Sequence, residues 1–585
     1  GCDYLLVETA SDPLNVKAAF EGIDGAAAEL GTSRPVAVSA TIESSGATLC
    51  GQSIEAFYTS IEHRDLLYVG LNCAVGPEFM ADPLRTLAAI AETPVACVPN
   101  AGLPDEQGRY SETPERMAGT LARFLDEGLL NLVGGCCGTT AEHVAAFARL
   151  AAGRAPRVPA ASRFGRVAGI DFLSLDEERR PLLVGERTNV IGSRKFKRLV
   201  AEGEWERAAE IGQGQVAGGA HVLDVCLADP DRDERADMER LLARLARRVR
   251  APLMIDSTDP AVVERALELV PGKPIVNSVN LEDGEERLGK VARLARRRGA
   301  ALVVGCIDDD PRQGMAIAAT RKLEVARRAH AILTTKYGVP ETDLIFDPLV
   351  FPCASGDAQY KGSARETIEG VRALKAAFPR CKTLLGVSNV SFGLPPAARE
   401  VLNSVFLHEC GEAGLDLAIV NSEKIVRFAQ IPNEEREAAL DLLRDRGEGA
   451  AERFAALFRD ARPRAAADEG GAAPIETRLA RRIVEARREG LESDVEEALT
   501  RYAPLDLING PLLDGMAEVG RLFGANELIV AEVLQSAEVM KAAVALLEPR
   551  LPLGAAPRKG TFLLATVKGD VHDIGKNLVG ILFAN

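Results

Sequence analysis

Between residues 175 and 430, eight short apolar runs alternate with longer amphipathic segments of helical length. The runs lie at residues 181–184, 221–225, 252–255, 274–276, 301–304, 344–346, 383–387 and 417–420. Strands that alternate with helices favour a parallel sheet, and eight such units are the number that closes a (β/α)8 barrel. The alternation therefore predicts one complete barrel in this part of the chain.

Residues 1–150 show the same alternation but contain only five apolar runs, which lie at residues 4–7, 35–39, 66–71, 94–98 and 130–133. Five strands are too few for an eight-stranded barrel, so we expect a partial barrel whose first three strand–helix units lie outside this chain. Because the chain opens inside an apolar run and ends soon after another, we interpret it as part of a longer protein. A stretch rich in Ala, Pro and Arg, at about 151–168, predicts a flexible linker between the two barrels.

The remaining sequence predicts two smaller domains. Residues 475–550 have helical spacing, which favours a small helical bundle, and a second flexible stretch at 462–474 precedes them. Further on, the apolar run 562–567 leads into a loop that contains Asp570 and His572. Open α/β sheets bind their ligands at such carboxyl ends of strands. We therefore expect the start of a Rossmann-like domain, in which Asp570 tunes the imidazole of His572.

The composition argues against several classes of function. The net charge is −15, without a basic stripe, which argues against nucleic acid as a partner. No apolar run approaches the roughly 18–20 residues that a membrane span requires, so we expect no membrane partner. The 11 cysteines, an odd number scattered over 585 residues, favour a reducing compartment over a disulfide framework. We therefore expect a cytoplasmic, multidomain α/β protein.

Three cysteines follow predicted strands of the partial barrel. Cys73 follows the run 66–71, and Cys136 with Cys137 follows the run 130–133. The carboxyl ends of parallel barrel strands share one face, so these thiols can approach one another. Three thiolates leave one tetrahedral position open, as in a catalytic zinc site, and zinc lowers the pKa of a further bound thiol. The alternative interpretation is three buried cysteines of the core.

Nearly every predicted strand of the complete barrel ends in an amide or a carboxylate. These residues are Glu186, Asn189, Asp224, Asp256, Asn277, Asp347, Asn389 and Asn421. Such a ring suits a flat, neutral heterocycle that carries amino, N–H and carbonyl groups. Any one of these residues is equally interpreted as a helix N-cap, but all of them together are explained less easily in that way.

Short motifs in all four segments resemble known families. The Asp-x-His-x-x-Gly run at 570–575 resembles the cobalamin-binding signature of corrinoid-dependent methyltransferases. The runs GLNCAVGP and GGCCGTT resemble the zinc motifs of homocysteine methyltransferases. The runs GERTN, IDS, VNS, DP and SNVSFG resemble the pterin-binding barrels of tetrahydrofolate methyltransferases. The helical segment around Phe523 and Val530 resembles the cap over cobalamin in the cobalamin-dependent methionine synthase family.

In this order the segments resemble that family over essentially the whole chain. The resemblance implies four domains: a homocysteine- and zinc-binding barrel, a pterin-binding barrel, a helical cap domain, and the start of a cobalamin-binding domain. Their predicted limits are 1–155, 175–445, 475–552 and 558–585.

The resemblance also assigns residues to ligands. It implies zinc at Cys73, Cys136 and Cys137, with Glu8 toward the ammonium group of homocysteine. It assigns the pterin to Asp256, Asn277, Asp347 and Asn389, with Asn389 catalytic beside the methyl-bearing nitrogen, and it gives supporting roles to Glu186, Asn189 and Asp224. It assigns cobalamin to His572 as the lower cobalt ligand, with Asp570 and Gly575 beside it, and to Phe523 and Val530 on the methyl side. The family usually has Leu where this chain has Val530.

The reaction implied by the resemblance is a methyl transfer of methionine biosynthesis. The N5-methyl of 5-methyltetrahydrofolate passes through cobalamin, as methylcobalamin, to the zinc-activated thiol of homocysteine, which gives methionine and tetrahydrofolate. A flavodoxin-type reductant is an implied partner of the full-length enzyme. Two alternatives are another corrinoid-dependent folate methyltransferase and a non-enzymatic corrinoid carrier. The three cysteines argue against the former and the polar strand ends argue against the latter.

Overall fold

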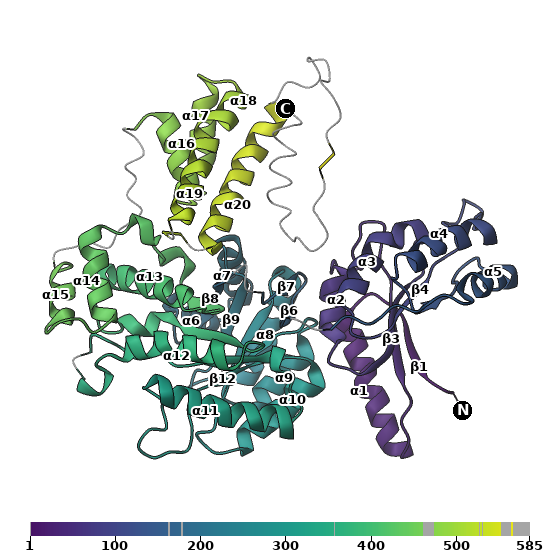
Figure 1. Cartoon of the computed structure of the whole chain (residues 1–585), viewed down its shortest axis with the longest axis horizontal. Helices are drawn as coiled ribbons and strands as arrows, with labels where there is room; N and C mark the ends of the chain where they lie inside the picture. The colour runs from purple at the N-terminus through teal and green to yellow at the C-terminus, as the bar shows by residue number, and fades with distance from the viewer. Residues whose placement is uncertain are drawn as a thin grey trace.

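The computed structural model describes residues 2–161, 164–176, 180–355, 357–459, 473–525, 527–528, 530–550 and 563–564. Figure 1 shows three bodies: an open α/β unit, a closed barrel beside it, and a helical bundle that lies against the barrel. The predicted start of a cobalamin-binding domain lies outside the described residues, apart from residues 563–564, and with it Asp570, His572 and Gly575.

The first unit is a five-stranded parallel sheet in which the strands follow one another in chain order. The strands are β1 (Leu5–Ala10), β2 (Val36–Ala40), β3 (Leu66–Asn72), β4 (Val95–Val98) and β5 (Leu132–Val133). The helices are α1 (Pro13–Leu30), α2 (Ile54–Ile61), α3 (Ala81–Ile90), α4 (Pro114–Asp126) and α5 (Ala141–Ala151). Helix residues such as Phe20, Phe57 and Phe124 pack onto Val38 and Leu71 of the sheet. The five strands and their helices agree with the predicted partial barrel.

The second unit is a closed barrel of eight parallel strands, as the alternation predicts. The strands are β8 (Leu182–Asn189), β9 (Val222–Cys226), β10 (Leu253–Asp256), β11 (Ile275–Val279), β12 (Ala301–Gly305), β13 (Leu344–Asp347), β14 (Lys382–Gly386) and β15 (Leu417–Val420). The helices are α6 (Arg194–Ala201), α7 (Trp205–Ala217), α8 (Glu234–Arg248), α9 (Pro260–Leu269), α10 (Glu286–Arg298), α11 (Ala319–Ala331), α12 (Ser363–Ala377) and α13 (Pro396–Glu412). Helix α14 (Asn433–Leu443) packs onto α13, and helix α15 (Ala450–Ala456) packs onto α14. The carboxyl ends of all eight strands therefore share one mouth.

A short hairpin closes the other end of this barrel. Strands β6 (Arg166–Ala168) and β7 (Phe172–Ser174) pair in antiparallel fashion. Ala168 forms a bridge with Lys273, just before β11, which places the hairpin at the amino-terminal end of the barrel strands. There Val167 and Leu173 join the apolar core of the barrel interior.

The prediction of a flexible linker at about 151–168 is wrong for two parts of this segment, the residues around Arg157 and those from Arg166 on. The last residues, from Arg166 on, form β6. Nearer the start, the guanidinium group of Arg157 is buried and donates to the carbonyl oxygens of Ala88, Ala91 and Thr93, at 2.5 to 3.2 Å. These carbonyl groups lie in the last turn of α3 or just beyond it, where helix carbonyls have no partner within the helix. The linker-like composition therefore conceals a segment that is anchored to the first unit.

The third unit is a small helical bundle, as predicted. Its helices are α16 (Ile475–Val484), α17 (Leu491–Leu499), α18 (Pro504–Leu507), α19 (Leu513–Gly524) and α20 (Val530–Leu547). Pro504 occupies the first turn of α18, where its missing N–H costs nothing, and Gly524 ends α19. Leu479, Leu512 and Met540 are fully buried in the common core.

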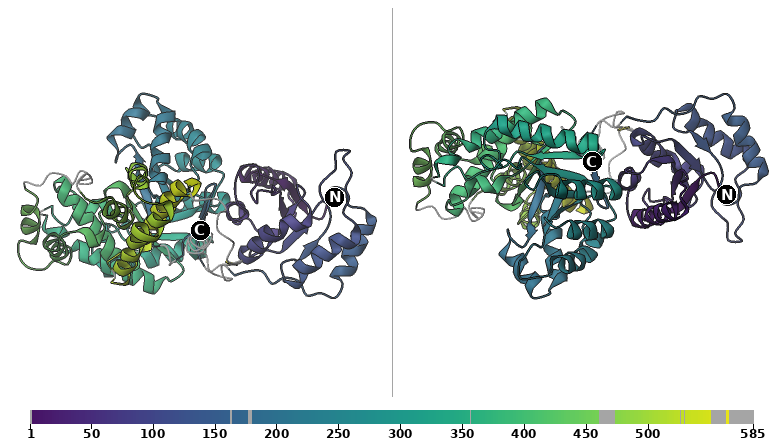
Figure 2. Two further views of the ribbon diagram at one scale, coloured as in Figure 1. Left: turned by 90° about the horizontal axis from the view of Figure 1, so that it is seen from above. Right: turned by 90° about the horizontal axis from the view of Figure 1, so that it is seen from below.

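Buried polar contacts join the three bodies. Lys273 of the barrel donates to Glu62 of the first unit at 2.9 Å and to Asp343 at 2.6 Å. Arg427, after β15, donates to the carbonyl oxygens of Val484 and Glu532 in the bundle at 2.6 and 2.7 Å. Figure 2 shows the first unit and the barrel side by side from two directions. Buried charged groups are costly unless they are paired, so these contacts favour the observed arrangement over a separated one.

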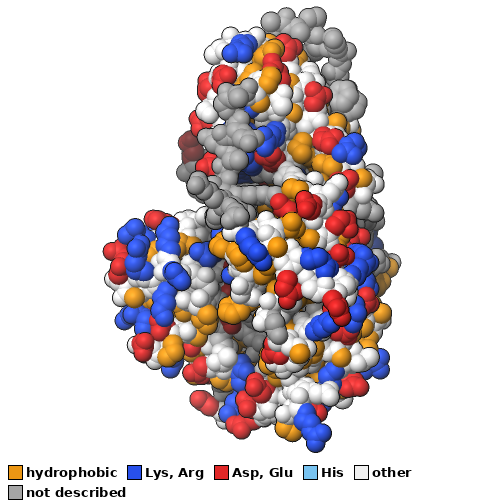
Figure 3. Space-filling view, turned by 90° about the vertical axis from the view of Figure 1, so that its left-hand side faces the viewer, with side chains coloured by type: hydrophobic (Ala, Val, Ile, Leu, Met, Phe, Trp, Pro, Cys, Tyr) orange, Lys and Arg blue, Asp and Glu red, His pale blue; other side chains and the backbone are white. Residues whose placement is uncertain are grey.

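The outer surface carries charges of both signs. Over the face in Figure 3, Lys and Arg side chains are interspersed with Asp and Glu side chains. Among the described residues, no helix combines the length and the apolar character that crossing a membrane requires.

Candidate functional site

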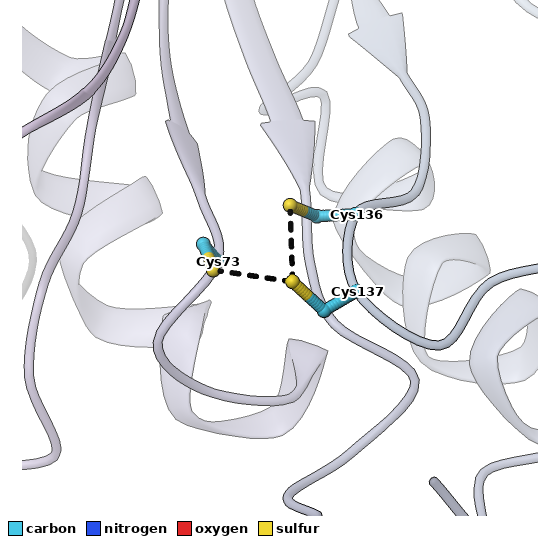
Figure 4. Close-up of side chains that lie close together, drawn as sticks. All are labelled: Cys73, Cys136 and Cys137. Carbon is cyan, nitrogen blue, oxygen red and sulfur yellow. Dashed lines mark hydrogen bonds between the residues drawn. The ribbon is translucent and has the colours of Figure 1, made fainter.

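The three predicted zinc ligands come together at one edge of the first unit (Figure 4). Cys73 follows β3 directly, and Cys136 and Cys137 follow β5. The Sγ atom of Cys137 lies 3.7 Å from that of Cys73 and 3.9 Å from that of Cys136. All three sulfur atoms lie within 4.8 Å of one another, and the described residues contain no other such group of three.

Strained backbone and hydrogen bonds hold the three thiols in place. Cys73 has a φ of 61°, a left-handed conformation that costs about 1 kcal/mol or more in a residue with a side chain. Asn72 donates to the Oγ1 atom of Thr9 at 2.8 Å and to the sulfur of Cys136 at 3.9 Å. The backbone N–H of Cys137 donates to the side-chain oxygen of Asn100 at 3.1 Å. The turn is therefore organised before any ligand arrives.

Gly138 makes this tight turn possible. Its φ is 82°, and a Cβ atom at this position would lie 2.3 Å from the ring of Tyr110. Any side chain would therefore push Tyr110 away and strain the backbone next to Cys137.

The acidity of the thiols is uneven. Partial burial, followed by the charge of Cys73, raises the pKa of Cys136 to about 11. Partial burial also acts to raise the pKa of Cys73, but hydrogen bonds from the Ala74 backbone and from Cys137 outweigh it, so this pKa is lowered. Three convergent sulfur ligands fit a thiophilic cation such as zinc, which would relieve the repulsion between thiolates.

Two groups beside the thiols were not predicted. Asn72 lies at the carboxyl end of β3 and Asn100 just beyond that of β4, which is the same strand-end pattern that marks the polar residues of the complete barrel. Glu8, which was predicted to contact homocysteine, is exposed on the edge strand β1. Its neighbour Thr9 contacts Asn72, but no contact of Glu8 with the thiols is present in the structure.

The predicted polar residues of the complete barrel gather at its carboxyl-terminal mouth. Asp256 and Asp347 are the last residues of β10 and β13, Asn277 lies in β11, and Asn389 lies in the turn after β14. Glu186 accepts from the Ser388 hydroxyl at 3.1 Å, and Asn189 donates to Asp224 at 3.0 Å. The structure therefore brings the predicted set to one opening, and Asn421 follows β15 at the same end.

The carboxyl groups of this mouth are held in an unusual state. Burial raises the pKa of Asp256 and of Asp347 to about 6. Burial, followed by the charge of Asp256, raises the pKa of Asp224 well above its usual value. The Oδ1 atoms of Asp224 and Asn421 are buried and lack a hydrogen-bond partner among the described residues. Unpaired buried acceptors are costly, so the mouth is suited to a ligand that donates hydrogen bonds.

A buried lysine that was not predicted supports Asp347. Lys322 of α11 is fully buried, and its Nζ atom donates to the carbonyl oxygens of Ala316, Pro348 and Leu349. Leu349 has a φ of 63°, and its N–H donates to Asp347 Oδ1 at 2.8 Å. Lys322 thus holds the strained turn that orients the Asp347 carboxylate.

The space for the Lys322 side chain comes from a glycine, and the position of Lys322 on its helix is a signal that the sequence contains. At position 370 in α12 a Cβ atom would lie 2.7 Å from the Lys322 side chain, so Gly370 leaves the space for it. Lys322 precedes Val325, Ala326 and Ala329 by three, four and seven residues, on the buried face of its helix. A charge at such an apolar position was the available signal.

The predicted cobalamin contacts in the bundle are only partly described. Phe523 lies in the last turn of α19, and 43% of its surface is exposed. Val530 is the first residue of α20, so the two residues flank the break between these helices.

Family models match all three bodies. The model for homocysteine S-methyltransferase matches residues 1–151, the model for pterin binding enzymes matches residues 185–421, and the model for the B12 binding domain matches residues 475–548. A solved dihydropteroate synthase from Thermus thermophilus covers 45% of this chain and 95% of its own, with 23% identity and a TM-score of 0.33.

Curated relatives match the chain from end to end. The methionine synthases of Mycobacterium leprae (strain TN) and of Mycobacterium tuberculosis (strain ATCC 25618 / H37Rv) are each 42% identical to it. Each alignment covers 100% of this chain and 50% of the relative, so the chain spans about half the length of the curated relatives it matches. The chain is therefore similar over its whole length to methionine synthases, and it contains in order the regions matched by the homocysteine S-methyltransferase, pterin-binding and B12-binding models.

Proposed function

We propose that this chain provides the two substrate sites of a methyltransferase that moves the N5-methyl of 5-methyltetrahydrofolate, by way of cobalamin, to the thiol of homocysteine. The products are methionine and tetrahydrofolate. The observation that carries the proposal is the presence, in one chain, of a three-thiol cluster and of a barrel mouth lined by carboxylates and amides, in which the Oδ1 atoms of Asp224 and Asn421 lack partners among the described residues. The first suits activation of a thiol substrate and the second suits a pterin.

The barrel mouth would hold and orient the pterin. The exocyclic amine and ring N–H groups of a pterin are donors, and Asp256 of β10, Asn277 of β11 and Asp347 of β13 offer acceptors. Asn389, with both a donor and an acceptor, is the residue we assign beside N5. Asn189 and Asp224 would hold the arrangement through the hydrogen bond between them, and Glu186 through the hydrogen bond that it accepts from Ser388.

The thiol cluster would hold zinc through Cys73, Cys136 and Cys137. Zinc, when bound, acts as a Lewis acid that keeps a coordinated substrate thiol deprotonated at neutral pH. The chain itself contributes the strained turn at Cys73 and the amides of Asn72 and Asn100, which keep the three sulfurs together. We assign Glu8 to the ammonium group of homocysteine, on the basis of the family motif alone.

Cobalamin, when bound, supplies the cobalt that carries the methyl group between the two sites. Phe523 is exposed at the break between α19 and α20, which suits a residue that shields a ligand. Phe523 and Val530 are our assignment for the methyl side of the cofactor, and Asp570, His572 and Gly575 are our assignment for its lower side. The domain limits 1–155, 175–445, 475–552 and 558–585, the cytoplasmic location and a flavodoxin-type reductant remain predictions.

Separate titrations of the chain test the proposal. We expect 5-methyltetrahydrofolate to bind, and the double variant Asp256→Ala with Asn389→Ala to weaken this binding at least about a hundredfold, because two polar contacts are lost. The same double variant should keep its zinc and should still methylate homocysteine from added methylcobalamin. Binding of 5-methyltetrahydrofolate that survives the double substitution would refute the barrel assignment.

Lys322→Met should weaken binding of 5-methyltetrahydrofolate about tenfold, because the Asp347 turn loses its anchor. Lys322 acts by positioning Asp347, so Lys322→Met should cause no further loss of affinity in a protein that already carries Asp347→Ala. Calorimetric titration of the two single variants and the double variant measures this coupling.

Lys273→Met is the matched control for Lys322→Met. Lys273 is also buried, but it pairs with Glu62 and Asp343 at the opposite end of the barrel strands. The variant Lys273→Met should lower the melting temperature of the protein and leave its affinity for 5-methyltetrahydrofolate unchanged. If the Lys322 and Asp347 losses simply add, Lys322 does not act through Asp347.

A further inference from the structure

A cavity with a volume of about 360 Å³ lies on the outer side of the barrel wall, beside the carboxyl end of β8. Residues of β8, of α6 with the turn before it, and of α7 line it. Its charged lining residues are Arg187, Lys195, Arg207 and Glu210. The cavity therefore combines three cations with one carboxylate.

The cations of this β8 cavity outnumber its carboxylates by three to one. Among the described residues, neither Lys195 nor Arg207 has an acidic partner within 4.0 Å. The guanidinium group of Arg187 donates to the carbonyl oxygen of Gly192 at 3.1 Å, and its backbone N–H donates to the side-chain oxygen of Gln215 at 2.7 Å. In contrast, Arg244 and Arg248 of the adjacent α8 both pair with Glu206 of α7, at 3.0 Å or less. Converging cations without partners attract anions, carboxylates and phosphates above all.

The strand order relates this cavity to the barrel mouth. Around the barrel the order is β10, β11, β12, β13, β14, β15, β8 and β9. The four residues assigned to the pterin lie at β10, β11, β13 and just after β14, and this set is centred on β12. In a ring of eight strands, β8 is the strand opposite β12. The remaining atoms of a ligand whose heterocycle is held around β12 can therefore reach β8 across the open mouth.

Arg187 connects the mouth to the cavity along one strand. It directly follows Glu186, which faces Ser388 inside the mouth. Arg187 lines the cavity instead, so these two neighbouring residues, in the irregular part of β8, face the mouth and the cavity respectively. A ligand group that leaves the mouth at the carboxyl end of β8 therefore passes from Glu186 to Arg187.

We propose that the β8 cavity binds the glutamate tail of the folate, with Arg187, Lys195 and Arg207 facing its carboxylates. This inference rests on the proposed function, because the pterin must first occupy the mouth. The tail of a folate carries two carboxylates with one glutamate and gains one with each further glutamate. The cavity thus selects folates with several glutamates over those with one.

The test compares three ligands in calorimetric titrations of the full chain. The ligands are a 5-methyltetrahydropterin without a tail, 5-methyltetrahydrofolate with one glutamate, and the same folate with three glutamates. We expect the affinity to rise along this series, and to rise less at high salt, because screening weakens exposed charge pairs. In the variant Lys195→Gln with Arg207→Gln, the affinity for the triglutamate should fall about tenfold, and that for the tail-free pterin should not change.

Arg198→Gln is the control for the charge change. Arg198 lies on the same helix as Lys195, is exposed, and is not among the cavity residues. It should leave all three affinities within about twofold. A triglutamate that binds no more tightly than the tail-free pterin would overturn the inference, as would an equal loss for all three ligands in the double variant. Failure of the tail-free pterin to bind the unsubstituted chain would instead count against the proposed function itself.

Discussion

Cys136→Ser should remove zinc from the thiol cluster and reduce methylation of homocysteine to background. Serine is a poor zinc ligand because its hydroxyl group stays protonated at neutral pH. Four-ligand zinc sites bind with about 10–16 kcal/mol, so one thiolate accounts for about 3 kcal/mol, or on the order of a hundredfold in affinity. Zinc content after dialysis against a chelator, and methionine formed from homocysteine and added methylcobalamin, are the two measurements.

Cys50→Ser separates loss of the metal from loss of a thiol. Cys50 lies in the same unit and is exposed, and it is not among the three clustered cysteines. It should therefore keep both zinc and activity. The Cys136 variant should still bind 5-methyltetrahydrofolate in the intact second barrel, which checks that the chain is folded. Full zinc content in the Cys136→Ser protein would rule out the cluster as the zinc site.

The fold was largely predictable because the main elements repeat a simple pattern. Parallel barrel strands are buried on both faces, so they form apolar runs, and the predicted run at 344–346 corresponds to β13 (Leu344–Asp347). The hairpin of β6 and β7 escaped prediction because each strand has only three residues. Its burial depends on the amino-terminal end of the barrel that it covers, which no local pattern reveals.

The candidate site was predictable where it follows from strand ends. Because parallel strands bring their carboxyl ends together, the approach of Cys73 to Cys137, 64 residues apart, could be inferred from sequence order. The contacts that hold the site residues in position could not be inferred from sequence order. Lys322 reaches Pro348 across 26 residues, and this contact depends on the strained turn and on the space at Gly370. Arg157 is similar, because its anchors lie more than 60 residues earlier in the chain.

Asp347→Asn should weaken binding of 5-methyltetrahydrofolate by about 30- to 100-fold. The Asp347 carboxylate has two acceptor oxygens, of which Oδ1 already accepts from the Leu349 N–H, whereas an amide has only one oxygen to serve both Leu349 and the pterin. Hydrogen bonds to a charged group contribute about 1.5–3 kcal/mol, which sets this range. Asp283→Asn is the control, because Asp283 is an exposed residue of a loop after β11. Calorimetric titration measures both affinities.

Asp347→Asn should also reduce the number of protons that are released when the folate binds near pH 6. Because burial raises the pKa of Asp347 to about 6, this carboxyl is partly protonated near pH 6. Donors of a bound pterin favour the ionised form, so binding near pH 6 releases protons and weakens as the pH falls. Titrations in buffers of different ionisation enthalpy count these protons. We expect fewer protons for Asp347→Asn, and a remainder from Asp256, whose pKa is also about 6.

Stability should change in the opposite direction to binding. The folded-state pKa of Asp347 lies above its ordinary value of 3.8, so its contribution to stability is present at low pH and is lost as the pH rises through about 6. At pH 7 the buried carboxylate therefore costs stability, by up to about 3 kcal/mol. Asparagine keeps the acceptor for the Leu349 N–H without the charge. A variant that binds the folate less tightly yet melts higher at pH 7 would identify Asp347 as a ligand-binding group, whereas lower stability together with unchanged affinity would contradict that role.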